Sequence, residues 1–419
     1  MLKKSSNDPT LFTESILAVS CFLHTLQSGS TWALLPNLLN ATEQASRYGN
    51  IIGVASAIGL ILSFVLGRAS DSIGRLWSYR ISVVLASLSS VLVAIGCVLG
   101  DSSTHLIVWG ALLSRVRASR VIARAFVVDF GGDRTLRLAR QGALSGFGFV
   151  VGPSLGGWLS TFGGTTATSL NAGICLLNCL LSWFVLRDVL VPVVSEKEKE
   201  KEKEKEKEKE KEKERVGVVV SNKIVFNEMI KYDSLLLCSI LFCLSFGFQA
   251  FTASFAMYCK SRFDFGPLEY GRVLSFCGVI WSTTNGLLLP FLKKKVKDDY
   301  YLLLTGISSL FVGRLILAVA RSWMILLLGE GFVVFGAAVS FTLLTSVLSK
   351  VVDKRVVGSA MGFTASMEAG CGIFVPPMVG FLFENYGDSS GALVSAVATA
   401  TGLIALLFGW REGLKEKKG

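Results

Sequence analysis

The stretch that decides the fold is Gly148-Phe149-Val150-Val151-Gly152-Pro153-Ser154-Leu155-Gly156-Gly157, which lies inside an apolar segment from 143 to 162. Glycines at 148, 152 and 156 fall on one face of a helix because they are four residues apart. In lipid there is little hydrophobic drive between helices, so a face without side chains lets two backbones approach and gain dispersion contacts. Pro153 removes one backbone donor and favours a bend. The stretch therefore predicts close helix packing inside a membrane.

The same pattern returns 224 residues later, over 372–380. Aligning 146–163 on 370–387 gives identity at six of eighteen positions. A repeat spaced by about half the chain predicts two copies of one helical unit. The identical positions in the first copy are Gly146, Gly148, Val151, Pro153, Gly156 and Gly163.

The composition is that of a polytopic membrane protein. Hydrophobic residues make up 51% of the chain, charged residues 17%, and the mean hydropathy is +0.56. A bilayer core about 30 Å thick needs roughly 20 apolar residues per helix. Twelve such runs are expected near 12–38, 47–67, 77–99, 106–129, 141–162, 166–187, 233–258, 268–292, 300–320, 323–349, 356–383 and 390–410.

The net charge of +11 follows membrane topology and does not indicate a nucleic-acid partner. With the N-terminus inside and the central linker left out, nineteen Lys and Arg residues lie in loops and span ends on the inner side and five on the outer side. This bias predicts that both termini are cytosolic. The protein itself is expected in the plasma membrane or an organelle membrane. The nine cysteines lie nearly all in apolar runs, which favours small buried side chains over disulfides or a metal site.

The chain divides into two halves of equal length around a charged linker. Glu and Lys alternate strictly from Glu196 to Glu214 and their charges, with Arg215, cancel. Alternation places like charges four residues apart and opposite charges three apart, so this run predicts a solvated tether. We expect an N-terminal six-helix bundle over 1–188, a cytosolic linker over 189–231 and a C-terminal six-helix bundle over 232–419.

A second motif follows the second expected span. Gly67, Asp71, Gly74 and Arg75 form a glycine, three residues, an aspartate, two residues, then glycine and arginine. This resembles the loop signature of the major facilitator superfamily, in which the aspartate and arginine belong to a cytosolic charge network that holds the two bundles in one state. The resemblance implies that Asp71 and Arg75 are such latch residues; an ordinary polar turn is the alternative. Ser72 and Leu76 stand where the family often has basic residues.

The stretch around Gly148, Gly152, Pro153, Gly156 and Gly157 resembles the fifth-span signature that this superfamily associates with proton-coupled drug exporters. Together with the twelve-span layout, this motif makes the chain similar to one branch of the superfamily, the tetracycline-transporter-like and organic-cation-transporter-like drug:proton antiporters. The resemblance implies two pseudo-symmetric bundles around a central cavity. Helix packing without any bearing on export is the alternative role for the glycines.

Polar residues inside the expected spans are the candidates for a cavity or for proton coupling, because ionisable groups at membrane depth usually line a pathway. His24 and Gln27 lie one turn apart in the first span, as either a packing pair or a substrate and proton contact. Arg115 in the fourth span is similar to a family arginine and is expected to face the cavity. Arg117, Arg120 and Arg124 are expected to be structural or interfacial.

Two carboxylates in the second half are candidates for proton coupling. Glu330 lies inside the tenth span and Glu368 inside the eleventh. A low-dielectric site disfavours the ionised carboxylate, so such a group exchanges protons near neutral pH. The alternative for each is a structural ion pair with an arginine such as Arg115 or Arg314.

The sequence therefore predicts an all-α membrane protein with twelve transmembrane helices that works as a secondary transporter. We expect export of a small organic solute in exchange for protons by a monomer, with no cofactor, no metal and no enzymatic activity. Facilitated or symport uptake of an organic anion is one alternative, favoured by the surplus of arginine at membrane depth. A non-transporting membrane scaffold is the other.

Overall fold

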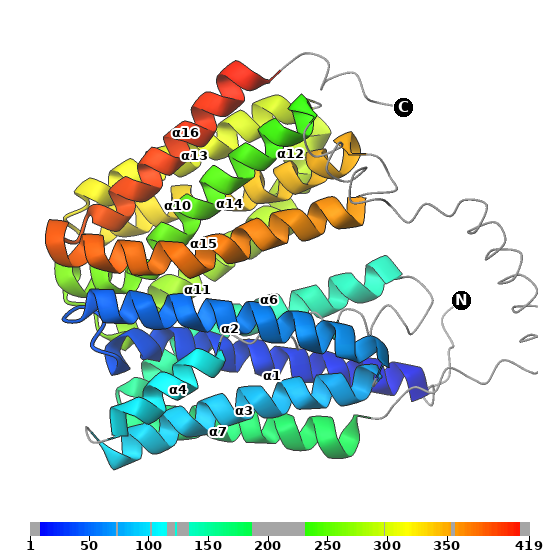
Figure 1. Cartoon of the computed structure of the whole chain (residues 1–419), viewed down its shortest axis with the longest axis vertical. Coiled ribbons are helices and arrows are strands. Elements are labelled where there is room, and N and C mark those ends of the chain that lie inside the picture. Colours follow the sequence, from blue (N-terminus) through cyan, green and yellow to red (C-terminus); the bar gives the residue numbers. More distant parts are fainter. Residues whose placement is uncertain are drawn as a thin grey trace, which may run out of the picture.

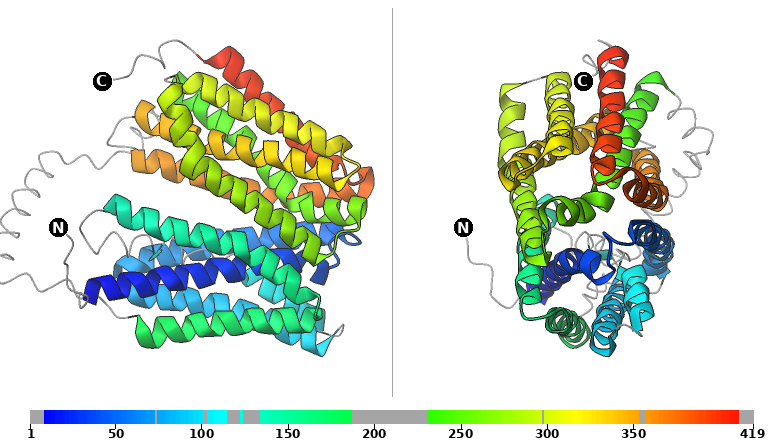
Figure 2. Two further views of the ribbon diagram at one scale, coloured as in Figure 1. Left: turned by 180° about the vertical axis from the view of Figure 1, so that it is seen from behind. Right: turned by 90° about the vertical axis from the view of Figure 1, so that its left-hand side faces the viewer.

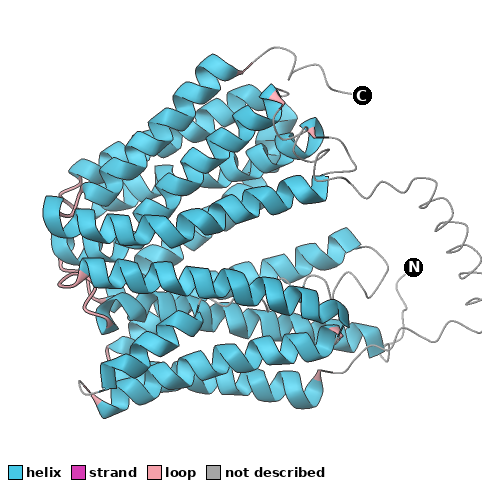
Figure 3. Ribbon diagram, viewed as in Figure 1, coloured by secondary structure: helices cyan, strands magenta, loops and turns pink. Residues whose placement is uncertain are grey.

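The computed structural model describes residues 9–72, 74–100, 103–114, 122–123, 134–186, 231–296, 298–352 and 357–410. These residues form helices joined by short loops, with no strand among them (Figure 3). Counting α7 with the π-helix η2 as one, and α11 with the π-helix η3 and α12 as another, the described part contains twelve helical segments. The all-helical fold predicted from the apolar runs is confirmed.

The helices of the first half are α1 (Pro9–Leu38), α2 (Ala45–Ser72), α3 (Arg75–Leu99), α4 (Thr104–Ser114), α6 (Arg134–Ser160), α7 (Gly164–Leu180) and η2 (Leu181–Val185). Those of the second half are α10 (Tyr232–Phe263), α11 (Pro267–Thr283), η3 (Thr284–Leu288), α12 (Leu289–Lys295), α13 (Asp299–Val319), α14 (Trp323–Val351), α15 (Val357–Tyr386) and α16 (Ser390–Gly409).

Local chemistry sets several of the helix ends. Asp298 begins α13 by accepting a hydrogen bond from the backbone N–H of Tyr300 at 3.0 Å, which satisfies one free donor of the first turn. Gly74 precedes α3 with φ of +98°, in the region that L side chains rarely adopt. The glycine of the sequence motif therefore has a backbone reason to be there.

Nine helices of the described part are long and apolar enough to cross a membrane by length and composition. α4 is a shorter apolar helix, while α1 and α6 have membrane length at 30 and 27 residues. The helices fall on the expected runs, although α6 begins at Arg134 where a span from 141 was expected, and most of the fourth expected span, 106–129, lies outside the described residues. Such extensions arise because a helix continues beyond the apolar residues that sequence analysis counts.

The two halves form two bundles that lie side by side (Figures 1 and 2). In the first bundle α1 packs on α6 and α7, and α3 packs on α4 and α7. In the second α13 packs on α14 and α16, and α10 packs on α15 and α16. The two bundles meet mainly through two helix pairs, α2 with α15 and α6 with α11.

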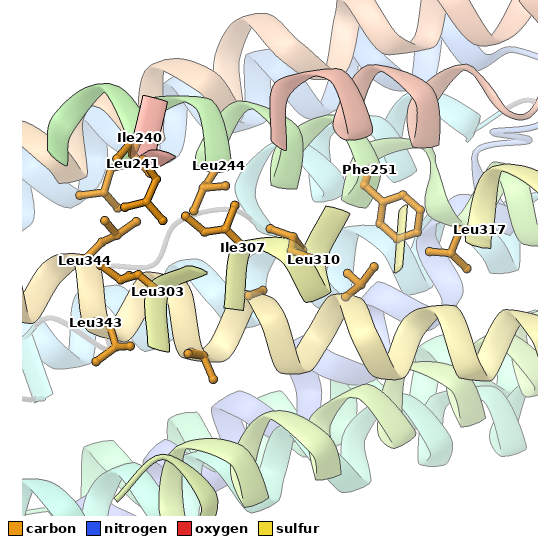
Figure 4. Packing of buried hydrophobic residues seen from close by; sticks show 14 of the residues in the cluster. Ile240, Leu241, Leu244, Phe251, Leu303, Ile307, Leu310, Leu317, Leu343 and Leu344 are labelled. Carbon is orange, nitrogen blue, oxygen red and sulfur yellow. The ribbon is translucent and has the colours of Figure 1, made fainter. Parts of the chain in front are cut away.

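The interior of the second bundle is mainly one large apolar cluster, in which leucines and isoleucines of α10, α13 and α14 interdigitate and Phe251 lies toward one end, near Leu317 (Figure 4). Because lipid is as apolar as leucine, this cluster gains stability from close packing and dispersion contacts more than from removal of water. The residues labelled in the figure are Ile240, Leu241, Leu244, Phe251, Leu303, Ile307, Leu310, Leu317, Leu343 and Leu344.

The first bundle has smaller apolar clusters and relies on neutral hydrogen bonds between helices. Ser20 Oγ of α1 lies 2.7 Å from Tyr79 Oη of α3, and donates to Asn178 Oδ1 of α7 at 2.6 Å. All three side chains are buried. Inside a membrane such bonds hold helices together, because no water competes for the polar atoms.

Contacts between the bundles are concentrated toward one end of the molecule and reach about halfway along α15. We call that end the closed end; it carries the loops 39–44, 264–266 and 387–389. At the opposite, open end, where α1 begins and α16 ends, the ribbons of the two bundles diverge (Figure 1). Along α15 the close approach to α2 runs from Gly380 to Gly372.

Candidate functional site

The glycine face of α6 lies against α1. A Cβ on Gly148 would stand 2.8 Å from the carbonyl oxygen of Phe22, and one on Gly156 would stand 2.7 Å from Cα of Ser30. A Cβ on Gly152 would overlap the carbonyl oxygen of Leu26. The four-residue spacing thus permits a backbone-to-backbone contact inside the first bundle.

Pro153 and Gly157 lie on another face of α6 and contact the opposite bundle. A Cβ on Gly271 of α11 would overlap the carbonyl oxygen of Pro153, and a Cβ on Gly157 would overlap that of Pro267. One motif therefore serves two contacts, one within a bundle and one between bundles.

The second copy of the motif repeats the contact between bundles. A Cβ on Gly49 of α2 would overlap the carbonyl oxygen of Pro376, and a Cβ on Gly380 would overlap that of Ala45. In each interface one bundle offers a glycine to the carbonyl oxygen of a proline on the other. The two contacts correspond in space with Pro153 matched to Pro376 and Gly157 to Gly380, one residue out of register with the sequence alignment, which pairs Gly156 with Gly380.

Each interface also carries one polar contact, and the two contacts differ. In α6/α11, Ser154 and Ser275 are linked through their hydroxyls at 2.7 Å, and the N–H of Ser154 donates to Ser275 Oγ at 3.2 Å. In α2/α15, Glu384 accepts from the N–H of Ser46 at 2.8 Å and also from its hydroxyl. A carboxylate at the start of α2 is favourable because free N–H groups and the helix dipole meet there.

Glu368 lies where the α2/α15 contact stops. It shares the face of α15 that carries Gly372, Pro376 and Gly380, because these positions are four residues apart. The last close approach to α2 along this face is at Gly372, where an added Cβ would lie 3.6 Å from the side chain of Ser56. Glu368 is one turn further toward the open end. Its side chain is exposed. A carboxylate at membrane depth is costly in lipid, so this position suits a polar space between the bundles.

The α6/α11 side has a corresponding polar group beyond its last contact. A Cβ placed on Gly146 would lie 3.7 Å from Ser282 Oγ of α11. Asn285 follows one turn later, in η3, which continues α11. Asn285 Oδ1 accepts from Thr342 Oγ1 of α14 at 2.8 Å. Hydrogen-bonding side chains therefore stand on both sides of the point where the bundles part.

Glu330 and Arg314 are the buried members of the Asp, Glu, Lys and Arg residues in the described part, with 3% and 1% of their surface exposed. Their side chains, on α14 and α13, interact electrostatically but do not form an ion pair within 4 Å. The Arg314 guanidinium carbon lies 3.8 Å from the centroid of the Phe251 ring, as a cation–π contact. The Cys277 thiol of α11 donates to Glu330 Oε2 at 3.4 Å.

This charged pair is incompletely satisfied. Nε and Nη1 of Arg314 and Oε1 of Glu330 are buried and form no hydrogen bond with the residues that the structure describes. Buried charges cost several kcal/mol each unless pairing and hydrogen bonding offset the loss of solvation. A stability role alone is a weak reason to keep such a pair in an apolar cluster.

A cavity of about 120 Å³ lies between the bundles at the closed end. Its lining includes Asn37, Asn40 and Glu43 from the first bundle and Lys260 and Tyr270 from the second. Tyr270 is also within electrostatic reach of Glu330. Tyr270 therefore lies between the buried carboxylate of Glu330 and the cavity at the closed end.

The remaining sequence candidates lie elsewhere. His24 and Gln27 are buried in α1, and Gln27 Nε2 donates to Ser90 Oγ of α3 at 2.7 Å and to Thr31 Oγ1 at 3.1 Å. Gln27 thus takes part in packing within the first bundle. Arg115, Arg117, Arg120 and Arg124 lie outside the described residues, as does the side chain of Asp71, whereas Gly67 lies within α2. Arg75 is the first residue of α3.

Three features escaped sequence analysis: the Cys277 contact, the Ser154–Ser275 pair and the Ser46–Glu384 contact. Each joins residues from different helices, and periodicity within one helix carries no signal of its partner. In the described ranges, no group of three His, Cys, Asp or Glu residues is placed to hold a metal ion.

Comparison with known proteins agrees with the fold. A family model described as Major Facilitator Superfamily matches residues 17–376. The chain is 24% identical over 398 residues to Multidrug resistance protein 2 of Bacillus subtilis (strain 168), covering 91% of each chain. It is 22% identical over 397 residues to the class D tetracycline resistance protein of Salmonella ordonez, covering 92% of this chain and 93% of the relative.

A solved structure supports the same architecture. A D-xylose-proton symporter matches with a TM-score of 0.69 at 15% identity, over 95% of this chain and 97% of that one. At this identity the likeness concerns the fold alone.

Proposed function

This chain belongs to the Major Facilitator Superfamily, and from that premise we propose that it exports a small organic solute in exchange for protons. Transport in this fold proceeds by rocking of two bundles about a site between them. A solute or proton drives that change only through its different affinities for the two states. Drug-resistance proteins among its relatives support export as the direction.

Glu330 is the observation that carries the proposal. It is a carboxylate buried in an apolar bundle, about 10 Å along α14 from Trp323 at 1.5 Å per residue. Arg314 gives the ionised form a partner, while the surrounding leucines disfavour charge. A group balanced in this way takes up and releases a proton when its surroundings change. We assign the proton to Glu330.

Glu368 is assigned to the solute. Its exposed carboxylate stands at the point where the bundles part, on the side of the open end. The bias of Lys and Arg toward one set of loops supports placing both termini, and with them the open end, in the cytosol. The same proposal takes 1–188 and 232–419 as two six-helix bundles of a monomer, joined by a cytosolic linker over 189–231.

The test is solute flux in proteoliposomes with and without an imposed pH gradient, for the wild type, Glu330→Gln and Glu368→Gln. Export coupled to Glu330 predicts that Glu330→Gln loses acceleration by the gradient while retaining solute exchange. Glu368→Gln is expected to raise the KM for solute with gradient dependence retained. Gradient dependence that survives in Glu330→Gln contradicts the assignment of the proton.

Uptake of an organic anion is the second candidate, favoured by Arg314, a buried guanidinium with hydrogen-bonding capacity left over. It predicts accumulation of anions inside proteoliposomes, either without a gradient or with protons moving in the same direction. A complete absence of flux over a broad panel of solutes supports a non-transporting scaffold instead.

A further inference from the structure

α11 presents two different faces to two different partners. Gly271, Ser275 and Gly278 recur at spacings of four and three residues, so they form one face, and this face contacts α6 of the other bundle. Cys277 lies two residues after Ser275, about 200° around the helix at 100° per residue. Its thiol points to the second bundle's interior and contacts Glu330 of α14.

We infer that Cys277 is a positioning residue that ties the charge of Glu330 to the contact between α11 and α6. The inference rests on the proposed function, because it takes Glu330 as the group that carries the proton. It adds the route by which protonation of Glu330 affects the contact between α11 and α6. One helix holds both ends of the route, so no chain of intermediate side chains is needed.

The chemistry of the contact makes it sensitive to charge. An ionised carboxylate accepts a hydrogen bond from the thiol, and such a bond is stronger than one to a neutral acceptor. When the carboxyl group binds a proton, its oxygen becomes a weaker acceptor and the thiol loses much of that attraction. Protonation therefore loosens α11 from α14 on one face, while the other face bears on Pro153 and Ser154 of α6.

The groups that face Glu330 come from three packed helices, and each bears on its charge. Arg314 of α13 favours the ionised form. The Cys259 thiol of α10 and the Tyr270 hydroxyl of α11 lie within electrostatic reach; like the Cys277 thiol, they belong to side-chain types that are ordinarily uncharged at neutral pH. Of these groups, Cys277 is the one whose hydrogen bond to Glu330 the structure records.

The experiment compares pH profiles of transport for Cys277→Ala, Cys277→Ser and a control, Cys243→Ala. Cys243 is also a half-buried cysteine of the second bundle, but it packs against Gly402 of α16. Loss of the donor in Cys277→Ala removes a bond to the ionised carboxylate, so the midpoint of the profile should rise by about one pH unit. Cys277→Ser keeps a donor and should restore the midpoint to within a few tenths of a unit of the wild type.

A second readout reports the movement itself. Spin labels are attached to ketone-bearing amino acids introduced at positions 144 and 366, which are exposed on α6 and α15. Because the labels react with ketones, the native thiols stay in place. The distance between the labels reports separation of the bundles, and its pH midpoint should shift in Cys277→Ala as the transport midpoint does. A structural role alone would lower protein yield without moving either midpoint.

Two results separate this inference from the proposed function. If Glu330→Gln abolishes gradient dependence but Cys277→Ala has the midpoint of Cys243→Ala, the inference is wrong and the function stands. If Glu330→Gln keeps gradient dependence, the function fails first and the inference falls with it. In the Glu330→Gln background, Cys277→Ala should change residual flux no more than Cys243→Ala does.

Discussion

The two bundles share one helical plan but differ in what holds their interiors together. In the first, neutral side chains such as Ser20, Tyr79 and Asn178 bond across helices that pack backbone to backbone. In the second, an apolar cluster surrounds the pair Arg314 and Glu330. Among the described residues, a buried carboxylate thus occurs in one bundle only. In the described part of the chain, the difference is therefore between an interior held by neutral hydrogen bonds and one that contains a guanidinium and a carboxyl group.

The strongest way to break this comparison is to remove the buried cation. Arg314→Gln removes the cation that interacts electrostatically with the ionised form of Glu330, so we expect the free energy of unfolding to fall by up to about 3 to 5 kcal/mol, the cost of leaving a buried charge uncompensated. Thermal unfolding of the detergent-solubilised protein measures it. The paired change Arg314→Met with Glu330→Leu should recover most of that loss, because it gives the second bundle a neutral interior like that of the first. Equal stability of the single and paired variants would contradict the role of the pair.

A smaller loss is expected from the backbone contact of the first bundle. Gly152→Ala places a methyl group against the carbonyl oxygen of Leu26, so α1 and α6 must separate. Overpacking of this kind costs about 1 to 3 kcal/mol. The control is Gly173→Ala on α7, where a Cβ meets nothing within 4 Å, so stability should not fall and should rise slightly because alanine favours a helix more than glycine does. Similar melting temperatures for both variants would show that the contact is loose.

The neutral network should prove weaker than either. Ser20→Ala removes the donor to Asn178 Oδ1 and the contact with Tyr79. Hydrogen bonds between membrane helices contribute about 0.6 to 1.7 kcal/mol, which is the expected loss. Ser239→Ala on α10 is the control, since Ser239 is exposed and bonds to its own helix at Leu235. The expectation fails if Ser20→Ala has the same melting temperature as the wild type.

The smallest effect concerns the boundary between the bundles. Glu384→Gln weakens the contact with Ser46 at the closed end without adding bulk. Because Glu384 is exposed, solvent screens its interaction with Ser46. The equilibrium between the conformation with the closed end shut and the one with it parted should therefore shift by less than about tenfold. Distances between spin labels across the closed end measure that equilibrium. A change in stability as large as that of Gly152→Ala would assign the contact to folding instead.

The sequence predicted the helices and their number because length and apolarity are properties of single segments. It also predicted that Gly148, Gly152 and Gly156 share a face. It did not reveal that this face meets α1 while Pro153 and Gly157 meet α11. Which faces meet depends on crossing angles and neighbours, and the pattern of one helix does not contain these.

The candidate site divides in the same way. Glu330 and Glu368 were identified because carboxylates are rare at membrane depth, and Arg314 was already an alternative partner. Their different surroundings, one buried and one exposed, came only from the structure. Cys277 was interpreted as a small buried side chain, since a thiol in an apolar run gives no sign of a partner 53 positions away.

The reciprocal contacts of Gly49 with Pro376 and of Gly271 with Pro153 have a further consequence. Such an exchange, in which each partner gives what it receives, is the geometry of an isologous dimer, where one surface patch meets a copy of itself. A true dimer must accept every substitution twice, once in each subunit. A single chain that carries both patches escapes that constraint, and here one patch has acquired a pair of serines while the other has acquired a carboxylate.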